Sequence, residues 1–114
     1  MAETDSRDMA TQGARSGETR TALPGAVPFD LVNVSRLSWE LGARVVEGDG
    51  ASVRSRWTHE ETAWSLSVFD VTSETAVLRL ETPVGRQRFF GTTQRDLATV
   101  YPALEAAPDW TRQA

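Results

Sequence analysis

The chain has 114 residues, a formal net charge of −4 at pH 7, no cysteine and no lysine. This length suffices for one small domain with a single core. The composition excludes disulfides, cysteine metal sites, thiolate nucleophiles and Schiff-base lysines, so any covalent chemistry would fall to Ser, Thr, Asp, Glu, Tyr or His.

Residues 1–22 contain no Leu, Ile, Val, Phe, Trp or Tyr. Because this segment has almost no apolar surface to bury, we expect a disordered N-terminal tail followed by a single α+β domain over residues 23–114. Neither the apolar region of a signal peptide nor a transmembrane stretch is present, which predicts a cytoplasmic protein without membrane contacts.

Two secondary structures compete for the first part of the domain. Residues 23–34 are apolar and broken by prolines, which predicts an extended arm or a short helix. Over 36–46 the apolar residues alternate with polar or small ones, and this period of two favours a half-buried strand. A helix within 30–46 would align Leu37, Leu41 and Val45, but it would place Gly42 in a helix interior, and it stays open as the alternative.

Four further strands are predicted over about residues 51–58, 63–71, 75–82 and 86–90. Their expected connections are a three-residue loop at 48–50, a four-residue loop at 59–62, a turn at 72–74 and a two-residue type I turn at 83–84. The loop at 59–62 would set Trp57 opposite Trp64 and leave His59 in an exposed bend. Five consecutive strands joined in this way form an antiparallel β-meander.

The periodicity changes after Gly91. Apolar residues then recur at the spacing i, i+3, i+4 and i+7, at Leu97, Val100, Tyr101 and Leu104. Thr93 and Asp96 precede them at the spacing of a capping box. We therefore expect one C-terminal amphipathic helix over about 93–107, packed on one face of the sheet.

The predicted register divides the side chains between two faces of the sheet. One face holds the expected core, which includes Trp39, Leu41, Val53, Trp57, Leu66 and Phe89. The other face carries an apolar and basic group: Phe69, Val71, Val77, Phe90, Arg79, Arg86 and Arg88. In this register Val77 lies opposite Phe90 and Arg79 opposite Arg88. The group is covered by the ends of the chain, or is a docking patch for another protein or a second copy, or results from a slip in the predicted register.

Candidates for catalysis are few. His59 beside Glu60 could act as an acid–base pair, and Asp70 is a carboxylate at an inward-facing strand end. The motifs H-E-x-x-H and G-x-S-x-G and the P-loop are absent, and one histidine cannot build a multi-histidine metal site, so we expect no metal and no cofactor.

A nucleic-acid role has one supporting pattern. Arginines at 54, 56, 79, 86 and 88, interleaved with Phe69 and Phe90, would form a platform for a single strand if they shared one sheet face. The net charge of −4 argues against this partner.

The sequence therefore favours a small non-enzymatic protein-binding module: an adaptor, an inhibitor or immunity-type protein, or a subunit of a larger assembly. Aromatic residues and arginines dominate interface energetics, and the predicted outer face offers both. A small enzyme and a single-strand nucleic-acid binder remain the alternatives.

Overall fold

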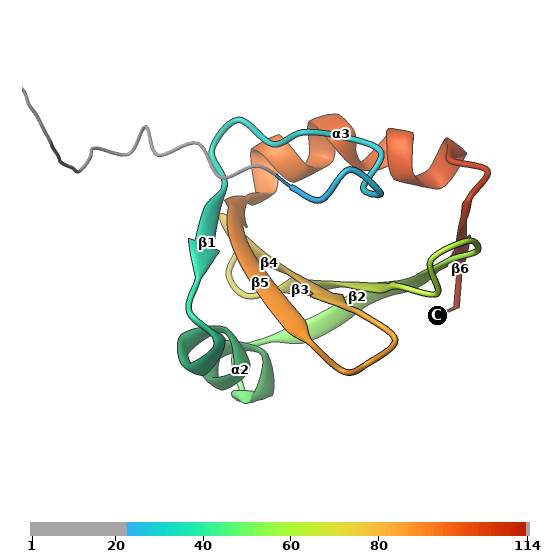
Figure 1. Cartoon of the computed structure of the whole chain (residues 1–114). Helices are drawn as coiled ribbons and strands as arrows, with labels where there is room; N and C mark the ends of the chain where they lie inside the picture. The colour runs from blue at the N-terminus through green and yellow to red at the C-terminus, as the bar shows by residue number, and fades with distance from the viewer. Residues whose placement is uncertain (1–22, 114) are drawn as a thin grey trace, which may run out of the picture.

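The structure is a computed structural model and describes residues 23–113. The elements in chain order are β1 (Ser35–Leu37), α2 (Trp39–Glu47), β2 (Ser52–His59), β3 (Ser65–Asp70), β4 (Thr75–Glu81), β5 (Gln87–Thr93), α3 (Gln94–Ala106) and β6 (Trp110–Arg112) (Figure 1). The predicted α+β class and antiparallel sheet are confirmed. The tail predicted over 1–22 lies outside the described residues.

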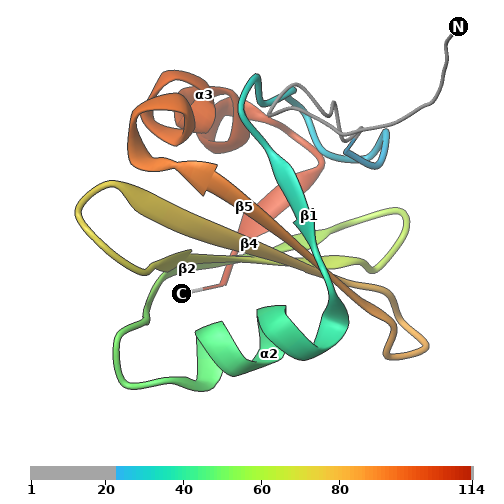
Figure 2. The same cartoon turned by 90° about the vertical axis from the view of Figure 1, so that its left-hand side faces the viewer.

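The described strands form one antiparallel sheet in the order β1-β5-β4-β3-β2-β6. Helix α3 and the segment 23–34 cover one face, which we call the α3 face, and α2 lies on the opposite face, which we call the α2 face (Figures 1 and 2). The fold is therefore a sheet between two unequal layers.

The larger core fills the space between the sheet and α3. It contains Val27, Leu31, Val34, Trp57, Leu66, Val68, Ala76, Leu78, Leu80, Phe90, Leu97, Leu104 and Trp110. The C-terminal helix was predicted almost to the residue: Thr93 is its N-cap and accepts a hydrogen bond from the Asp96 N–H at 3.1 Å. Trp110 Nε1 donates to the Ala26 carbonyl oxygen at 2.8 Å, which ties the segment 23–34 to β6.

The strand predicted over 36–46 is wrong. Only Ser35–Leu37 is extended, and Ser38 then caps α2 by accepting a hydrogen bond from the Leu41 N–H. The alternative, a helix within 30–46, is right from Trp39 onward. Gly42 counted against a helix in the sequence, yet a Cβ at Gly42 would lie 2.2 Å from Cγ of Phe89. Glycine is required here because the helix backbone rests directly on a buried ring.

The β4–β5 hairpin differs from its prediction by one residue. Its loop comprises the three residues 83–85, with Gly85 at φ +88°, and the Thr82 N–H bonds to the Arg86 carbonyl oxygen. Leu78 therefore pairs with Phe90, and Arg79 with Phe89. Since neighbouring residues on a strand point to opposite faces, this shift exchanges the faces of the two phenylalanines.

The β2–β3 hairpin also differs from its prediction, but without changing faces. The His59 N–H bonds to the Trp64 carbonyl oxygen, so the loop is 60–63 rather than 59–62, and Ala63 takes a positive φ of 59°. Trp57 pairs with Leu66 and not with Trp64. The displacement of two residues preserves the alternation, and Trp57 stays in the core as expected.

Candidate functional site

The apolar residues predicted to form a docking patch are covered by the chain itself. Phe69 (4% exposed) and Val77 (2%) pack with Phe89 beneath α2, and Val71 packs against the same cluster. Phe90 is buried on the α3 face instead. For Phe69, Val71 and Val77 the cover is α2, which was predicted as part of the sheet, whereas Phe90 shares its core with the segment 23–34 and Trp110.

The three predicted arginines do not share a face. Arg79 lies on the α2 face, where its guanidinium stands 5.1 Å from the centroid of the Phe69 ring. Arg88 pairs with Leu80 and therefore points toward the α3 face. Arg86 lies at the end of the β4–β5 loop and is exposed. Phe90 and Arg88 therefore lie on the opposite sheet face from Arg79, and the predicted platform for a nucleic-acid strand is not formed.

His59 is buried, contrary to the exposed bend that was predicted. Its ring packs edge-on against Trp110 with centroids 5.0 Å apart. Nδ1 accepts the Thr62 backbone N–H at 3.2 Å and lies 2.9 Å from Thr62 Oγ1. Glu60 is exposed, and its backbone N–H bonds to the Asp109 carbonyl oxygen. These contacts give the histidine a role in closing its hairpin, because its Nδ1 lone pair is occupied within the turn.

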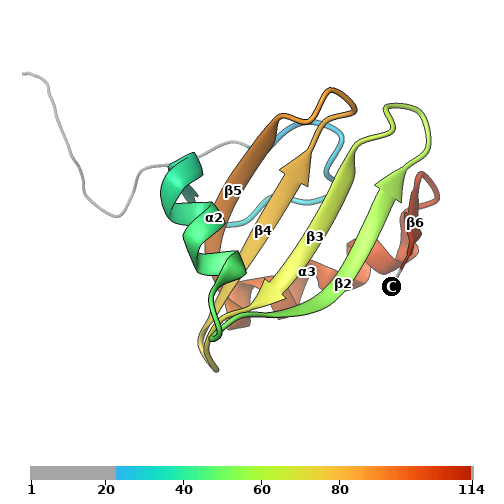
Figure 3. The same ribbon diagram turned by 90° about the horizontal axis from the view of Figure 1, so that it is seen from below.

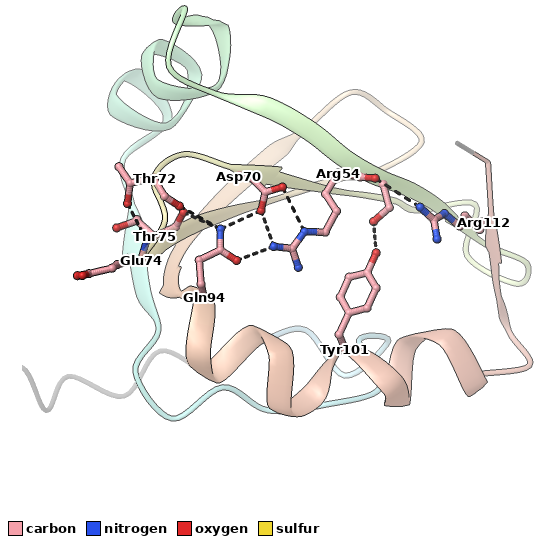
Figure 4. A network of polar contacts seen from close by, with 9 residues as sticks. Arg54, Asp70, Thr72, Glu74, Thr75, Gln94, Tyr101 and Arg112 are labelled. Atoms are coloured by element: carbon pink, nitrogen blue, oxygen red, sulfur yellow. Dashed lines mark hydrogen bonds and ion pairs between the residues drawn. The ribbon is translucent and has the colours of Figure 1, made fainter.

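Asp70, the third catalytic candidate, belongs to a polar network between the sheet and α3 (Figure 4). Arg54 Nη2 donates to Asp70 Oδ1 at 2.5 Å and to Gln94 Oε1 at 2.6 Å, and Gln94 Nε2 donates to Asp70 Oδ1 at 2.8 Å. The hydrogen bonds from Arg54 are the main cause that lowers the pKa of Asp70. A carboxylate held in its ionised form by an arginine is suited to anchoring a helix rather than to accepting a proton near neutral pH.

A β-bulge explains why Arg54 joins this network. The register of β2 against β3 shifts between Val53 and Ser55, and Arg54 lies at the extra position. A bulge re-aims a side chain, so Arg54 reaches α3 although its predicted alternation placed it on the outer face. There its guanidinium also lies 5.6 Å from the centroid of the Tyr101 ring. The network fixes α3 to the sheet.

A pocket of about 470 Å³ adjoins this network at Gln94. Its lining includes Asn33, the β3–β4 turn and the first residues of α3. Two carboxylates, Glu74 and Asp96, face it together with Arg95, and Asn33 Nδ2 donates to Asp96 Oδ2 at 2.7 Å. Because the charges in the lining are of both signs and partly satisfied internally, the pocket does not select an ionic ligand.

The α2 face offers a better site, because α2 covers only part of it. The helix packs on β5 and β4 and over Phe69 of β3, so that β2 and the rest of β3 lie beyond it among the described residues (Figure 3). The part of this face beyond α2, here called the open strip, follows from the strand register and comprises Val53, Arg56, Thr58, Ser65, Ser67 and the neighbouring Arg79 of β4; Ser67 itself is buried. It is small, hydroxyl-rich and basic.

Exposed apolar side chains accompany the open strip. Trp39 is 64% exposed and Leu41 46% on α2, and Val53 at the start of β2 is 42% exposed. All three were expected in the core. The serine N-cap at Ser38 was the sequence signal for a helix over 39–47. In that helix Trp39 and Leu41, two residues apart, point in different directions.

Comparison of the chain with known protein families, with curated proteins and with solved structures finds no match. Within residues 23–113, no helix is both long enough and apolar enough to cross a membrane. The functional argument therefore rests on the α2 face itself.

Proposed function

We propose that this chain is a non-enzymatic protein-binding module that docks through the α2 face, using the exposed side chains of α2 and the open strip. The observation that carries the proposal is Trp39, which is 64% exposed on the nine-residue helix of the α2 face. A tryptophan held on a rigid helix loses little conformational entropy when a partner covers it.

The composition of this face supports the same conclusion. Tryptophan and arginine are enriched among the residues that contribute most to binding, and Arg56 and Arg79 lie on the side of the sheet on which α2 packs. Leu41 and Val53 add exposed apolar surface on the same side of the sheet. Over residues 23–113 the α3 face is covered by α3 and the segment 23–34. Docking through the α2 face would leave the main core undisturbed.

The test is quantitative capture of partners with matched serine substitutions. Tagged wild type, Trp39→Ser and Leu41→Ser are compared with Val84→Ser, which replaces an 83%-exposed residue in the β4–β5 loop. A partner bound by wild type and Val84→Ser should bind the Trp39 variant about 30-fold more weakly or worse. The stability of that variant should change by no more than about 0.5 kcal/mol.

Equal capture by Trp39→Ser and wild type, with the variant folded, would refute docking through this face. Light scattering of the purified chain identifies the kind of partner. A dimer that dissociates in Trp39→Ser but persists in Val84→Ser would make a second copy the partner, whereas a monomer at all concentrations would require a different protein.

A further inference from the structure

Three side chains form a row across the open strip, one from each of three neighbouring strands. Arg56 of β2 pairs with Ser67 of β3, and Ser67 pairs with Arg79 of β4. Directly paired residues of antiparallel strands point to the same face with Cα atoms about 5 Å apart, so the two arginine Cα atoms are roughly 10 Å apart. The Arg56–Ser67–Arg79 row thus holds two guanidinium groups on either side of a small hydroxyl.

The hydrogen-bonding capacity of this row is largely unused. Arg79 Nη2 donates to Ser67 Oγ at 3.3 Å, but Arg79 Nε is shielded from solvent and has no partner. Within residues 23–113, neither Arg79 nor Arg56 has a carboxylate within ion-pair distance. Glu81 lies on the same face, two residues further along β4 than Arg79, and it forms no ion pair with either arginine. A buried donor without a partner is costly, so a ligand that supplies an acceptor is favoured.

Arg79 is also held in place before any ligand arrives. Its guanidinium rests over the Phe69 ring, which is itself fixed beneath α2. Ser67 Oγ, on the same strand as Phe69, accepts a hydrogen bond from this guanidinium. Because the side chain is ordered in advance, less entropy is lost when it binds an oxyanion. Arg56, in contrast, is exposed and can close over the ligand.

We infer that the Arg56–Ser67–Arg79 row binds a carboxylate side chain, Asp or Glu, of the protein that docks on the α2 face. This inference rests on the proposed function and names the chemistry of its partner. Guanidinium groups bind carboxylates through paired hydrogen bonds. Glu81 beside the row reduces the local charge of the two arginines to one net positive charge, which matches one carboxylate rather than a doubly charged phosphate.

The experiment follows the arginine Nε–Hε resonances of the full chain by NMR during titration with a hexaglutamate peptide and, separately, with inorganic phosphate. Arg79 and Arg56 should show saturable shifts with the peptide at an affinity on the order of millimolar. Arg56→Gln and Arg79→Gln should each weaken peptide binding at least about fivefold. Arg44→Gln, the same charge change at an exposed site on α2, should weaken it less than about twofold.

Two further arms keep the inference falsifiable. Arg79→Lys retains the charge but loses the planar fork, and it should weaken peptide binding about threefold or more, while Arg44→Lys should not. Equal effects of the Arg44 and Arg79 variants, or shifts spread evenly over all arginines, would overturn the inference and leave only a general charge effect. Saturable binding of phosphate without binding of the peptide would overturn the assignment to a carboxylate.

These outcomes are independent of the capture experiment. If the peptide does not bind but Trp39→Ser still abolishes partner capture, the row is not the recognition site and the docking face stands. If Trp39→Ser leaves capture intact, the docking face is refuted whatever the arginines bind.

Discussion

Gly42→Ala tests whether a glycine sets the distance between α2 and the sheet. A Cβ at Gly42 would lie 2.2 Å from Cγ and 2.4 Å from Cβ of Phe89, a residue that is 1% exposed. Carbon atoms make favourable contact at about 3.5 Å, so the helix and the ring would have to separate by roughly 1.3 Å. Overpacking lowers the free energy of unfolding by about 1–3 kcal/mol, whereas the higher helix propensity of alanine raises it by up to about 1 kcal/mol. Because a buried ring cannot yield, we expect a net loss of about 2 kcal/mol.

Urea and thermal unfolding of the full chain measure this loss, and Tm should fall by roughly 8–16 °C. Gly50→Ala is the matched control, since no atom lies within 4 Å of its added Cβ, and its stability should change by no more than about 0.5 kcal/mol. Replacing the ring by the smaller side chain in Phe89→Leu should reduce the loss of unfolding free energy caused by Gly42→Ala in a double-mutant cycle. An unchanged or raised stability of Gly42→Ala would refute the close approach of α2 to the sheet.

Two further predictions concern the β4–β5 loop and the polar network. Gly85→Ala should destabilise the chain by about 1 kcal/mol in urea unfolding, because the φ of +88° at Gly85 disfavours any side chain even though no atom lies within 4 Å of an added Cβ. Gly25→Ala is the control, since an added Cβ there also has no atom within 4 Å. An unchanged stability of Gly85→Ala would contradict the three-residue loop. Arg54 lowers the pKa of Asp70 below its ordinary value of 3.8, so ionised Asp70 stabilises the fold fully above about pH 5 and progressively less as pH falls through the lowered pKa. The difference in unfolding free energy between wild type and Asp70→Asn should therefore be largest between about pH 5 and 7 and shrink below about pH 4; a difference independent of pH would show that ionisation of Asp70 does not contribute.

The strands and the helix that could be predicted are those whose apolar residues follow one regular spacing along the sequence. Strands near 51–58, 63–71 and 75–82 alternate between a packed and a polar side, and the helix over 94–106 repeats its apolar residues at helical spacing. The residues that define the pattern are buried where the pattern places them, at Trp57, Leu66, Val68, Leu78, Leu80, Leu97 and Leu104, and the exception is Val53 beside the bulge. Periodicity and capping were sufficient there because one element presents one face to the core.

Segment 36–46 could not be decided from periodicity, since its apolar residues suit both a strand and a short helix. The structure uses Gly42 as the contact with the sheet and leaves Trp39 and Leu41 largely exposed. That choice depends on the position of Phe89, a residue about 50 positions further along the chain. Local propensity counts glycine against a helix, and only the tertiary contact reverses the preference.

The candidate site was missed for reasons that also lie outside local patterns. One extra residue in the loop at 83–85 decides which of Phe89 and Phe90 faces α2. A bulge decides that Arg54 faces α3 while Arg56 faces the other way. Each feature shifts a single position, yet each transfers a side chain to the opposite face. Local patterns therefore could not show which side chains share the α2 face.

The observed register also changes which charges lie next to Arg79. In the predicted pairing it faced Arg88 directly, and like charges directly opposed across strands destabilise a sheet. In the structure it pairs with Phe89 on one side and Ser67 on the other, and the next arginine in the row is Arg56. Two unit charges on the order of 10 Å apart in water repel by only about 0.4 kcal/mol. The fold can therefore keep both cations on one face without an ion pair to Glu81 among the described residues, and an acidic side chain from a partner would gain attraction from both.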